Sequence, residues 1–163
     1  MAVTSSGSAV VTLPTDTQIL ITREFAAPKH LVYKAYTTPE LIKRWWSGQR
    51  GDVTRAEVDL RIGGKWRYVM VTPDGFEVAF HGEYREIVPN ERIVFTEVYE
   101  GAPEMEGDVV CTCTFTETDG RTNLTLLADH PSKEIRDTIL NSGMEAGMQE
   151  GMDLLEQVAI SLR

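Results

Sequence analysis

Residues that perform nucleophilic or acid–base chemistry are few in this sequence and are poorly spaced for it. Its three histidines are His30, His81 and His130. None has an obvious serine or cysteine nucleophile and an orienting acid at a recognisable spacing. Gly63-Gly64 lacks the strand–loop–helix context of a phosphate-binding loop. We predict no catalytic residue, and a paired-carboxylate hydrolase stays open because nothing selects two of the 25 acidic residues.

Cysteine chemistry is equally limited. Cys111 and Cys113 are the only cysteines, and they stand two residues apart in a strand-like run. Both side chains therefore point to one face and are poorly placed for a mutual disulfide. No further cysteine or histidine lies at ligand spacing, so we predict neither a metal site nor a cofactor. Reduced cysteines favour a cytoplasmic setting.

Residues suited to binding a ligand fall on one face of the predicted strands. Glu97 is in register with Phe95 and is an acid on an otherwise apolar face. Either its strand end reaches solvent, or it is the polar group of a cavity with a raised pKa. Trp66, Tyr68 and Tyr84 also face inward. Tyrosine hydroxyls orient ligands in cavities, but buried tyrosines also find partners without a ligand.

The stretch from Ser132 to Leu162 has apolar residues at helical spacing and predicts one long helix with a buried face. Within it, glycines recur every fourth residue and each precedes a methionine: Gly143-Met144, Gly147-Met148 and Gly151-Met152. An interior glycine costs about 1 kcal/mol relative to alanine. Glycines on the inward face either allow close approach to the sheet or leave volume for a ligand. The methionines suit an adaptable pocket or simply fill the core.

The opposite side of this predicted helix is polar and is expected to face away from the sheet. It carries Glu145, Gln149, Asp153 and Glu156.

The other elements follow from periodicity and turn signals. One strand, 18–25, precedes two short helices that begin near Pro28 and Thr38. Trp45 and Trp46 end the second helix; being adjacent, one anchors the helices and the other sits near a pocket rim. Six further strands follow in hairpin succession: 53–60, 65–72, 77–88, 92–99, 109–116 and 122–128. Residues 1–17 show no period and are expected to be a flexible leader before a single domain, 18–163.

Composition excludes several classes of partner. The chain has 163 residues and a net charge of −9, which argues against nucleic acid and against an anionic membrane surface. No apolar run approaches the ~20 residues of a membrane span, and the N-terminus lacks a signal-peptide pattern. Both a monomer and a homodimer are compatible with the sequence.

Six segments, in order, carry a resemblance to a known family. They are Arg23-Glu24-Phe25-Ala26-Ala27-Pro28, Thr38-Pro39-Glu40 running to Trp45-Trp46, Asp59-Leu60-Arg61-Ile62-Gly63-Gly64, Gly82-Glu83-Tyr84-Arg85-Glu86-Ile87-Val88-Pro89, Arg92-Ile93-Val94-Phe95-Thr96 and Gly143-Met144-Glu145-Ala146-Gly147-Met148. The chain resembles the START and Bet v 1-like (SRPBCC) superfamily. Within it, the chain is similar to bacterial proteins grouped with the activator of the heat-shock protein 90 ATPase.

The resemblance implies an α+β helix-grip fold. A seven-stranded antiparallel sheet would wrap a long C-terminal helix, with two short helices between the first two strands. It also implies a cavity between sheet and helix for a hydrophobic small molecule, such as a lipid, an aromatic compound or a polyketide. One departure is Met148, where many relatives carry tryptophan, so a relative's ligand is not carried over. The expected ligand-binding residues are Trp46, Trp66, Tyr68, Met70, Phe80, Tyr84, Phe95, Glu97, Cys113, Met144, Gly147, Met148 and Gly151.

Two alternatives remain beside a binding module. The first is a co-chaperone-like regulator with a chaperone partner, which a single domain makes less favourable. The second is a polyketide-cyclase-like enzyme, which the sequence would hide because such enzymes act mainly by shaping a cavity.

Overall fold

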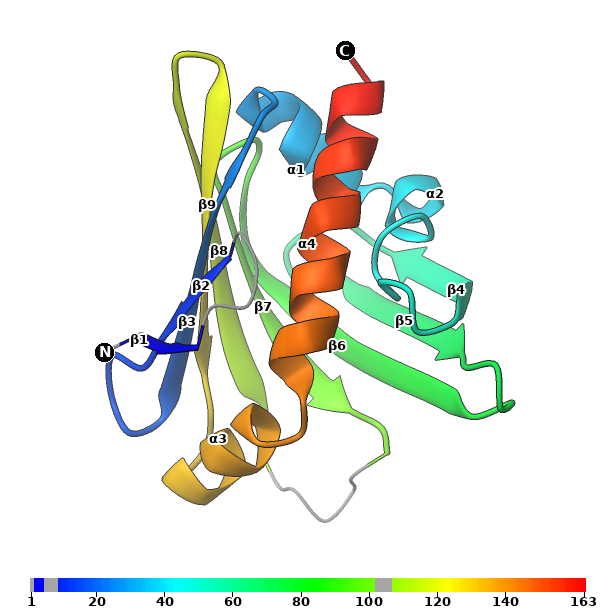
Figure 1. Cartoon of the computed structure of the whole chain (residues 1–163), viewed down its shortest axis with the longest axis vertical. Helices are drawn as coiled ribbons and strands as arrows, with labels where there is room; N and C mark the ends of the chain where they lie inside the picture. Colours follow the sequence, from blue (N-terminus) through cyan, green and yellow to red (C-terminus); the bar gives the residue numbers. More distant parts are fainter. Residues whose placement is uncertain (1, 5–8, 102–106) are drawn as a thin grey trace.

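The computed structural model describes residues 2–4, 9–101 and 107–163. Its strands form one antiparallel sheet in the order β1-β2-β3-β9-β8-β7-β6-β5-β4 (Figure 1). The strands are β1 Ala2–Thr4, β2 Val10–Thr12, β3 Gln18–Phe25, β4 Asp52–Val58, β5 Lys65–Val71, β6 Glu77–Val88, β7 Arg92–Tyr99, β8 Val109–Thr118 and β9 Arg121–Asp129. Strands β4 to β9 pair in the order in which they follow along the chain, so that sequence neighbours lie side by side.

Seven of these nine strands are those that the periodicity predicts, and the sheet is larger than expected by the two at the N-terminus. Residues 10–12 fall in the segment expected to be a flexible leader, yet they pair with β3, with Val11 opposite Ile21. Ala9 and Val11 are fully buried. A three-residue strand is too short to display a period, which is why β2 could not be predicted from periodicity.

The two short helices lie between β3 and β4, as expected. They are α1, Lys29–Thr37, and α2, Pro39–Ile42. Pro28 precedes α1, and Pro39 occupies the first turn of α2, where its missing N–H costs nothing.

The long C-terminal helix is interrupted, which corrects the expectation of one continuous element. Its two parts are α3, Lys133–Leu140, and α4, Met144–Ser161. Ser132 caps α3 by accepting a hydrogen bond from the Ile135 amide at 3.2 Å. Gly143 precedes α4 with φ of 87°, a left-handed conformation that glycine adopts without a steric penalty. The glycine in this position therefore allows the chain to change direction between the two helices.

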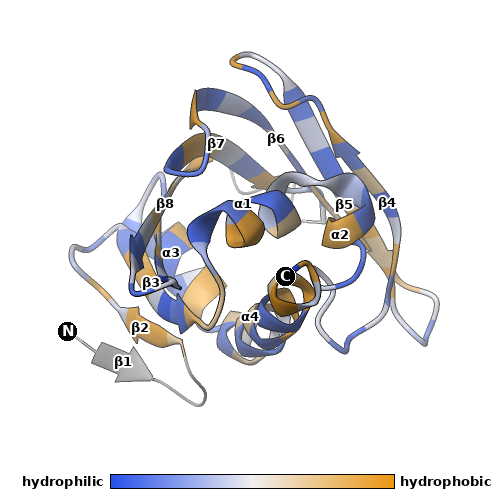
Figure 2. Ribbon diagram, turned by 90° about the horizontal axis from the view of Figure 1, so that it is seen from above, coloured by the Kyte–Doolittle hydropathy of each residue, from blue (hydrophilic) through white to orange (hydrophobic). Residues whose placement is uncertain are grey.

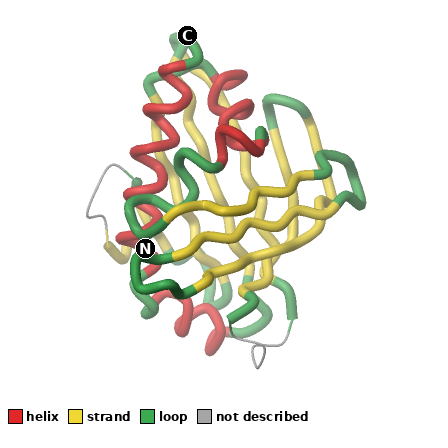
Figure 3. The backbone as a smooth tube through the Cα atoms, turned by 90° about the vertical axis from the view of Figure 1, so that its right-hand side faces the viewer, coloured by secondary structure: helices red, strands yellow, loops and turns green. Residues whose placement is uncertain are grey.

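The helices gather on one side of the curved sheet. Viewed along α4, the strands form an arc around α4 and α1 (Figure 2). The tube in Figure 3 shows α4 running along the strands and α3 beyond its end. A single cluster of buried apolar side chains reaches from Ala9 to Ala159 and fills the space between these layers.

The polar side of α4 does not all face solvent. Gln149 is buried: its Oε1 accepts from the Ala9 amide at 3.0 Å, and its Nε2 donates to the Ala9 carbonyl at 2.8 Å. Asp153 and Glu156 hold the buried Arg23 of β3, at 2.7 and 3.1 Å. The expected outward face is therefore partly an interface with the N-terminal strands.

Candidate functional site

An aromatic wall lines the inner side of the sheet where β5, β6 and β7 meet. The Trp66 ring lies 4.7 Å from Tyr68 and 5.7 Å from Phe95, measured between centroids. The Trp46 ring stands edge-on to Tyr68 and Phe80, at 5.4 and 5.6 Å. Such edge-on pairs contribute roughly 0.5–1.5 kcal/mol each beyond the area they bury. Five of the expected ligand-binding residues thus form one surface.

The adjacent tryptophans have separate roles. Trp45 is buried, donates its indole N–H to the Ala35 carbonyl at 2.9 Å, and stacks on Tyr36 at 5.3 Å. Trp45 therefore ties the turn after α2 to α1. Trp46 is half-buried and packs on the aromatic wall instead.

Trp66 reaches across β6 because Gly82, its partner there, has no side chain. The Trp66 indole donates to the Thr96 carbonyl on β7 at 3.1 Å. A Cβ at position 82 would overlap that carbonyl oxygen and the indole nitrogen. Thr96 also accepts, through Oγ1, the amide hydrogen of Glu83 at 3.0 Å. The glycine therefore fixes the position of the Trp66 ring.

Beside the aromatic wall lies a group of polar side chains, which we call the inner polar row: Tyr33, Tyr36, Tyr68, Tyr84, Glu97, Cys111 and Cys113. Tyr68 and Tyr84 are neighbours, and beyond burial each affects the pKa of the other. Tyr36 lies near Cys113 and partly opposes the rise that burial causes in the pKa of that thiol. The Cys111 thiol donates to Glu97 Oε2 at 3.8 Å.

One member of the inner polar row lacks a partner. The Tyr33 hydroxyl is buried and forms no hydrogen bond within the described residues. Its ring packs edge-on against Phe115, with centroids 5.5 Å apart. Leaving a buried hydroxyl unbonded costs about 1–3 kcal/mol, so this oxygen offers a hydrogen bond to a molecule placed beside it.

Burial disfavours the charged forms of the side chains in the inner polar row. It raises the pKa of Glu97, an effect that the Cys111 hydrogen bond partly opposes. Burial likewise raises the pKa of Tyr36, Tyr68 and Cys111 well above their usual ranges. A thiol with a raised pKa is a poor nucleophile at neutral pH. The Glu97 side chain nevertheless keeps partial exposure.

The three glycines of the C-terminal stretch have three different environments. Gly143 supplies the left-handed residue before α4. A Cβ on Gly147 would meet no heavy atom within 4 Å, so open space lies beside it. A Cβ on Gly151 would lie 3.4 Å from the Trp45 carbonyl oxygen, an ordinary contact distance. Room for a ligand beside Gly147 and close packing at Gly151 therefore stay predictions.

The remaining expected residues border the same region. Met144 and Met148 are half-buried at the start of α4 and pack against the core around Gly147. Met70 is half-buried further along β5, on the face that carries Tyr68. Met152 is fully within the core and acts as filler.

Sequence reasoning did not select Tyr33, Tyr36 and Cys111 as site residues. The two tyrosines lie three apart on α1, and their rings read as part of its apolar side. The signal was the residue type itself, because two tyrosines on one buried helical face bring two hydroxyls into the interior.

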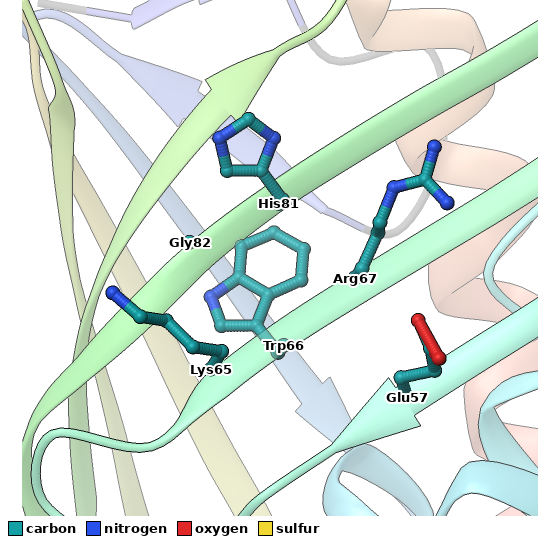
Figure 4. A pocket seen from close by; sticks show the side chains of 6 residues that line it. All are labelled: Glu57, Lys65, Trp66, Arg67, His81 and Gly82. Carbon is teal, nitrogen blue, oxygen red and sulfur yellow. The ribbon is translucent and has the colours of Figure 1, made fainter.

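A separate hollow of about 430 Å³ lies over β4, β5 and β6. Figure 4 shows its lining, which consists of Glu57, Lys65, Trp66, Arg67, His81 and Gly82. Its charges are already paired. Glu100 accepts from Arg67 at 2.9 and 3.0 Å and contacts His81 Nδ1 at 2.9 Å. The Arg67 hydrogen bonds, followed by that of His81, lower the pKa of Glu100 to about 2.

The described residues contain neither a group of side chains suited to a metal ion nor a membrane-spanning helix. Within residues 9–101 and 107–163, no three acidic, histidine or cysteine side chains lie close enough to share a metal ion. Among the helices of the same ranges, none is both long and apolar enough to cross a bilayer.

Comparison with known proteins identifies the family. The model of the "Activator of Hsp90 ATPase homolog 1-like protein" family matches residues 26–159, which hold the aromatic wall and the inner polar row. The chain belongs to this family. No curated protein matches the chain.

Solved structures of other AHSA1-like and related bacterial proteins share the fold. A Rhodobacter sphaeroides protein has a TM-score of 0.87 at 24% identity, covering 94% of this chain and 99% of its own. A Mycobacterium smegmatis protein reaches 0.80 at 26% identity, covering 91% and 94%. An AHSA1-like protein from Aeromonas hydrophila reaches 0.68 at 20% identity, covering 88% and 93%.

Proposed function

We propose that this AHSA1-like protein binds a hydrophobic small molecule between its sheet and α4. The observation that carries the proposal is the inner polar row beside the aromatic wall. Uncharged hydroxyls, thiols and one carboxyl lie among apolar rings, which is the composition of small-molecule pockets. These polar groups would orient the ligand. Burial of the ligand's apolar surface would supply most of the affinity, at roughly 25 cal/mol per Å² removed from water.

Two further features support this location. The Tyr33 hydroxyl is buried without a partner, so a ligand oxygen or nitrogen beside it would satisfy a group that now carries a desolvation cost. Gly147 faces open space at the start of α4, between half-buried Met144 and Met148. Flexible methionine side chains can adjust to ligands of different outline.

The direct test is native mass spectrometry of freshly purified protein, followed by thermal shift with a panel of lipids and aromatic compounds. A co-purified mass, or stabilisation by panel members, is expected. Gly147→Leu should fill the open space and remove the response. Ala146→Leu provides the control, because it adds a leucine to the same turn of α4 at an exposed position. The absence of any bound mass and any shift would contradict the proposal.

The two alternative functions predict different experimental results. A co-chaperone-like regulator should stimulate the ATP turnover of the host chaperone, and Gly147→Leu should leave that stimulation intact because the residue lies at the inner side of α4. A polyketide-cyclase-like enzyme should need Glu97 or an interior tyrosine for turnover but not for folding. Neither has an observation in its favour equal to the inner polar row.

A further inference from the structure

Glu97 is an acid among apolar and weakly polar side chains on the inner face of β7 and β8. Its neighbours there are Ile93, Phe95, Val109, Cys111, Cys113 and Phe115. The acid further along the same face of β8, Glu117, is exposed near the strand end and accepts from the Lys29 amide at 2.8 Å. Burying a carboxyl without a counter-charge is costly, and the cost appears as its raised pKa.

Nothing in the described chain neutralises this carboxyl. The bonded neighbour of Glu97 is the Cys111 thiol at 3.8 Å, a weak donor. No basic side chain of residues 9–101 and 107–163 forms an ion pair with it. The buried arginine of the same interior, Arg23, is already held by Asp153 and Glu156. The interior thus has one acid whose opposite charge is missing.

Aromatic rings surround the same position. Glu97 follows Phe95 by two residues on the same face of β7, and the Phe95 ring lies 5.7 Å from that of Trp66. The Tyr68 ring is in turn flanked by Trp46 and Trp66, at 5.4 and 4.7 Å. The faces of Trp and Tyr rings attract organic cations, by about 2 kcal/mol when water is excluded.

We infer that the ligand is an apolar molecule carrying one organic ammonium group, which pairs with Glu97 and packs against the surrounding rings. This inference rests on the proposed function and names the chemical class that the site selects. A primary amine would donate to the carboxylate while its apolar body lies along the aromatic wall. A carboxylic acid of the same shape would place a second negative charge beside Glu97, which disfavours fatty acids as ligands.

The test uses ligands that share one body and differ in charge. Isothermal titration at pH 7.5 would compare 2-naphthylmethylamine, 2-naphthylmethanol and 2-naphthoate, and likewise decylamine, decanol and decanoate. In at least one series, the amine should bind about tenfold or more tightly than the alcohol, and the carboxylate most weakly. Glu97→Gln should reduce amine affinity to that of the alcohol and change alcohol affinity less than twofold.

Glu100→Gln is the matched control, because it makes the same change of charge on the outer face of the sheet. It should keep the amine preference. Equal binding of amine and alcohol, or an amine preference that survives Glu97→Gln, would overturn the ammonium inference while leaving the proposed function in place. Failure of all six compounds to bind the wild-type protein would overturn the ammonium inference, whereas the proposed function falls only if no mass co-purifies and no panel compound gives a thermal shift. Circular dichroism melts would confirm that each variant is folded.

Discussion

Gln149 of α4 binds both backbone polar groups of Ala9, a residue 140 positions earlier in the chain. Its amide acts as a strand neighbour would, donating to the carbonyl and accepting from the N–H. Ala9 and Val11 are fully buried by this arrangement. Residues 9–12 are therefore part of the packed structure and are bound to the same helix that covers the sheet.

Gln149→Ala should lower the free energy of unfolding by about 1–3 kcal/mol, because the buried Ala9 groups lose their partners. Urea denaturation would measure this. The contribution should depend on the N-terminal segment, so in a chain that lacks residues 1–12 the same substitution should cost much less. Equal costs in both backgrounds would show that the Gln149–Ala9 pair does not carry the effect.

Gly147 and Gly151 should respond oppositely to leucine. Gly147→Leu places its side chain in open space within a helix and should hold or raise stability, by up to about 1 kcal/mol, through helix propensity. Gly151→Leu meets the Trp45 carbonyl and should cost about 1–3 kcal/mol through overpacking. Chemical denaturation of both variants would measure their free energies of unfolding. Similar losses of stability at the two positions would contradict the open space at Gly147.

Arg23 should be among the side chains most important for stability. It is buried on β3, pairs with Asp153 and Glu156, and lies 4.7 Å over the Phe25 ring. Arg23→Met should cost roughly 3 kcal/mol, as expected when one partner of a buried ion pair is removed.

The control is Arg121→Met, which breaks the exposed pair with Glu24 at 2.8 Å. Surface pairs contribute about 0–1 kcal/mol, so this variant should change little. Thermal melts of both variants would give their losses of unfolding free energy. Losses that differ by less than about 1 kcal/mol would disprove the role assigned to Arg23.

Glu100 should give the protein acid sensitivity. Its pKa is about 2 in the folded state, below the ordinary value of a glutamate, because Arg67 and His81 bond its ionised form. Its stabilising contribution is therefore complete above about pH 5 and is lost as the pH falls towards 2. Glu100→Gln should flatten the decline in melting temperature over this range. A parallel decline in the variant would exclude Glu100 as the source.

Glu97 should make the stability of the protein depend on pH in the opposite direction. Burial raises its folded pKa, so the folded state binds a proton more tightly than the unfolded chain does. Its contribution is complete below the ordinary glutamate pKa and is lost as the pH rises through the raised value. The melting temperature of Glu97→Gln relative to wild type should therefore increase between about pH 4 and neutrality. A constant difference across that range would contradict the raised pKa.

Periodicity and turn residues were sufficient to predict seven strands and both short helices. Alternation in segments such as Lys65–Val71 is strong because one face of the sheet is buried and the other is wet. The interruption at Gly143 was missed because the apolar spacing continues on both sides of it, and only the backbone conformation shows the change of direction. The short strand Val10–Thr12 carries too few residues for any pattern to appear.

The site was predicted in part, for a physical reason. Inward positions of strands follow from alternation, so Trp66, Tyr68 and Phe95 could be placed on one surface. Side-chain positions that depend on tertiary contacts could not be predicted in this way. Gln149 appeared to be on a polar helical face, and its burial depends on a strand that begins 139 residues earlier. Similarly, the Tyr36 hydroxyl meets Cys113 because α1 crosses the sheet, which no local pattern encodes.

The position of β4 at one edge of the sheet has a consequence for solubility. An open edge presents unpaired backbone groups on which another chain can add as a strand. Here the edge strand carries Asp52, Arg55 and Glu57, all exposed, with Arg55 and Glu57 3.7 Å apart. Any chain docking edge to edge would have to strip water from these charges. The short, charged strand thus keeps copies of the protein from joining into an extended sheet at high concentration.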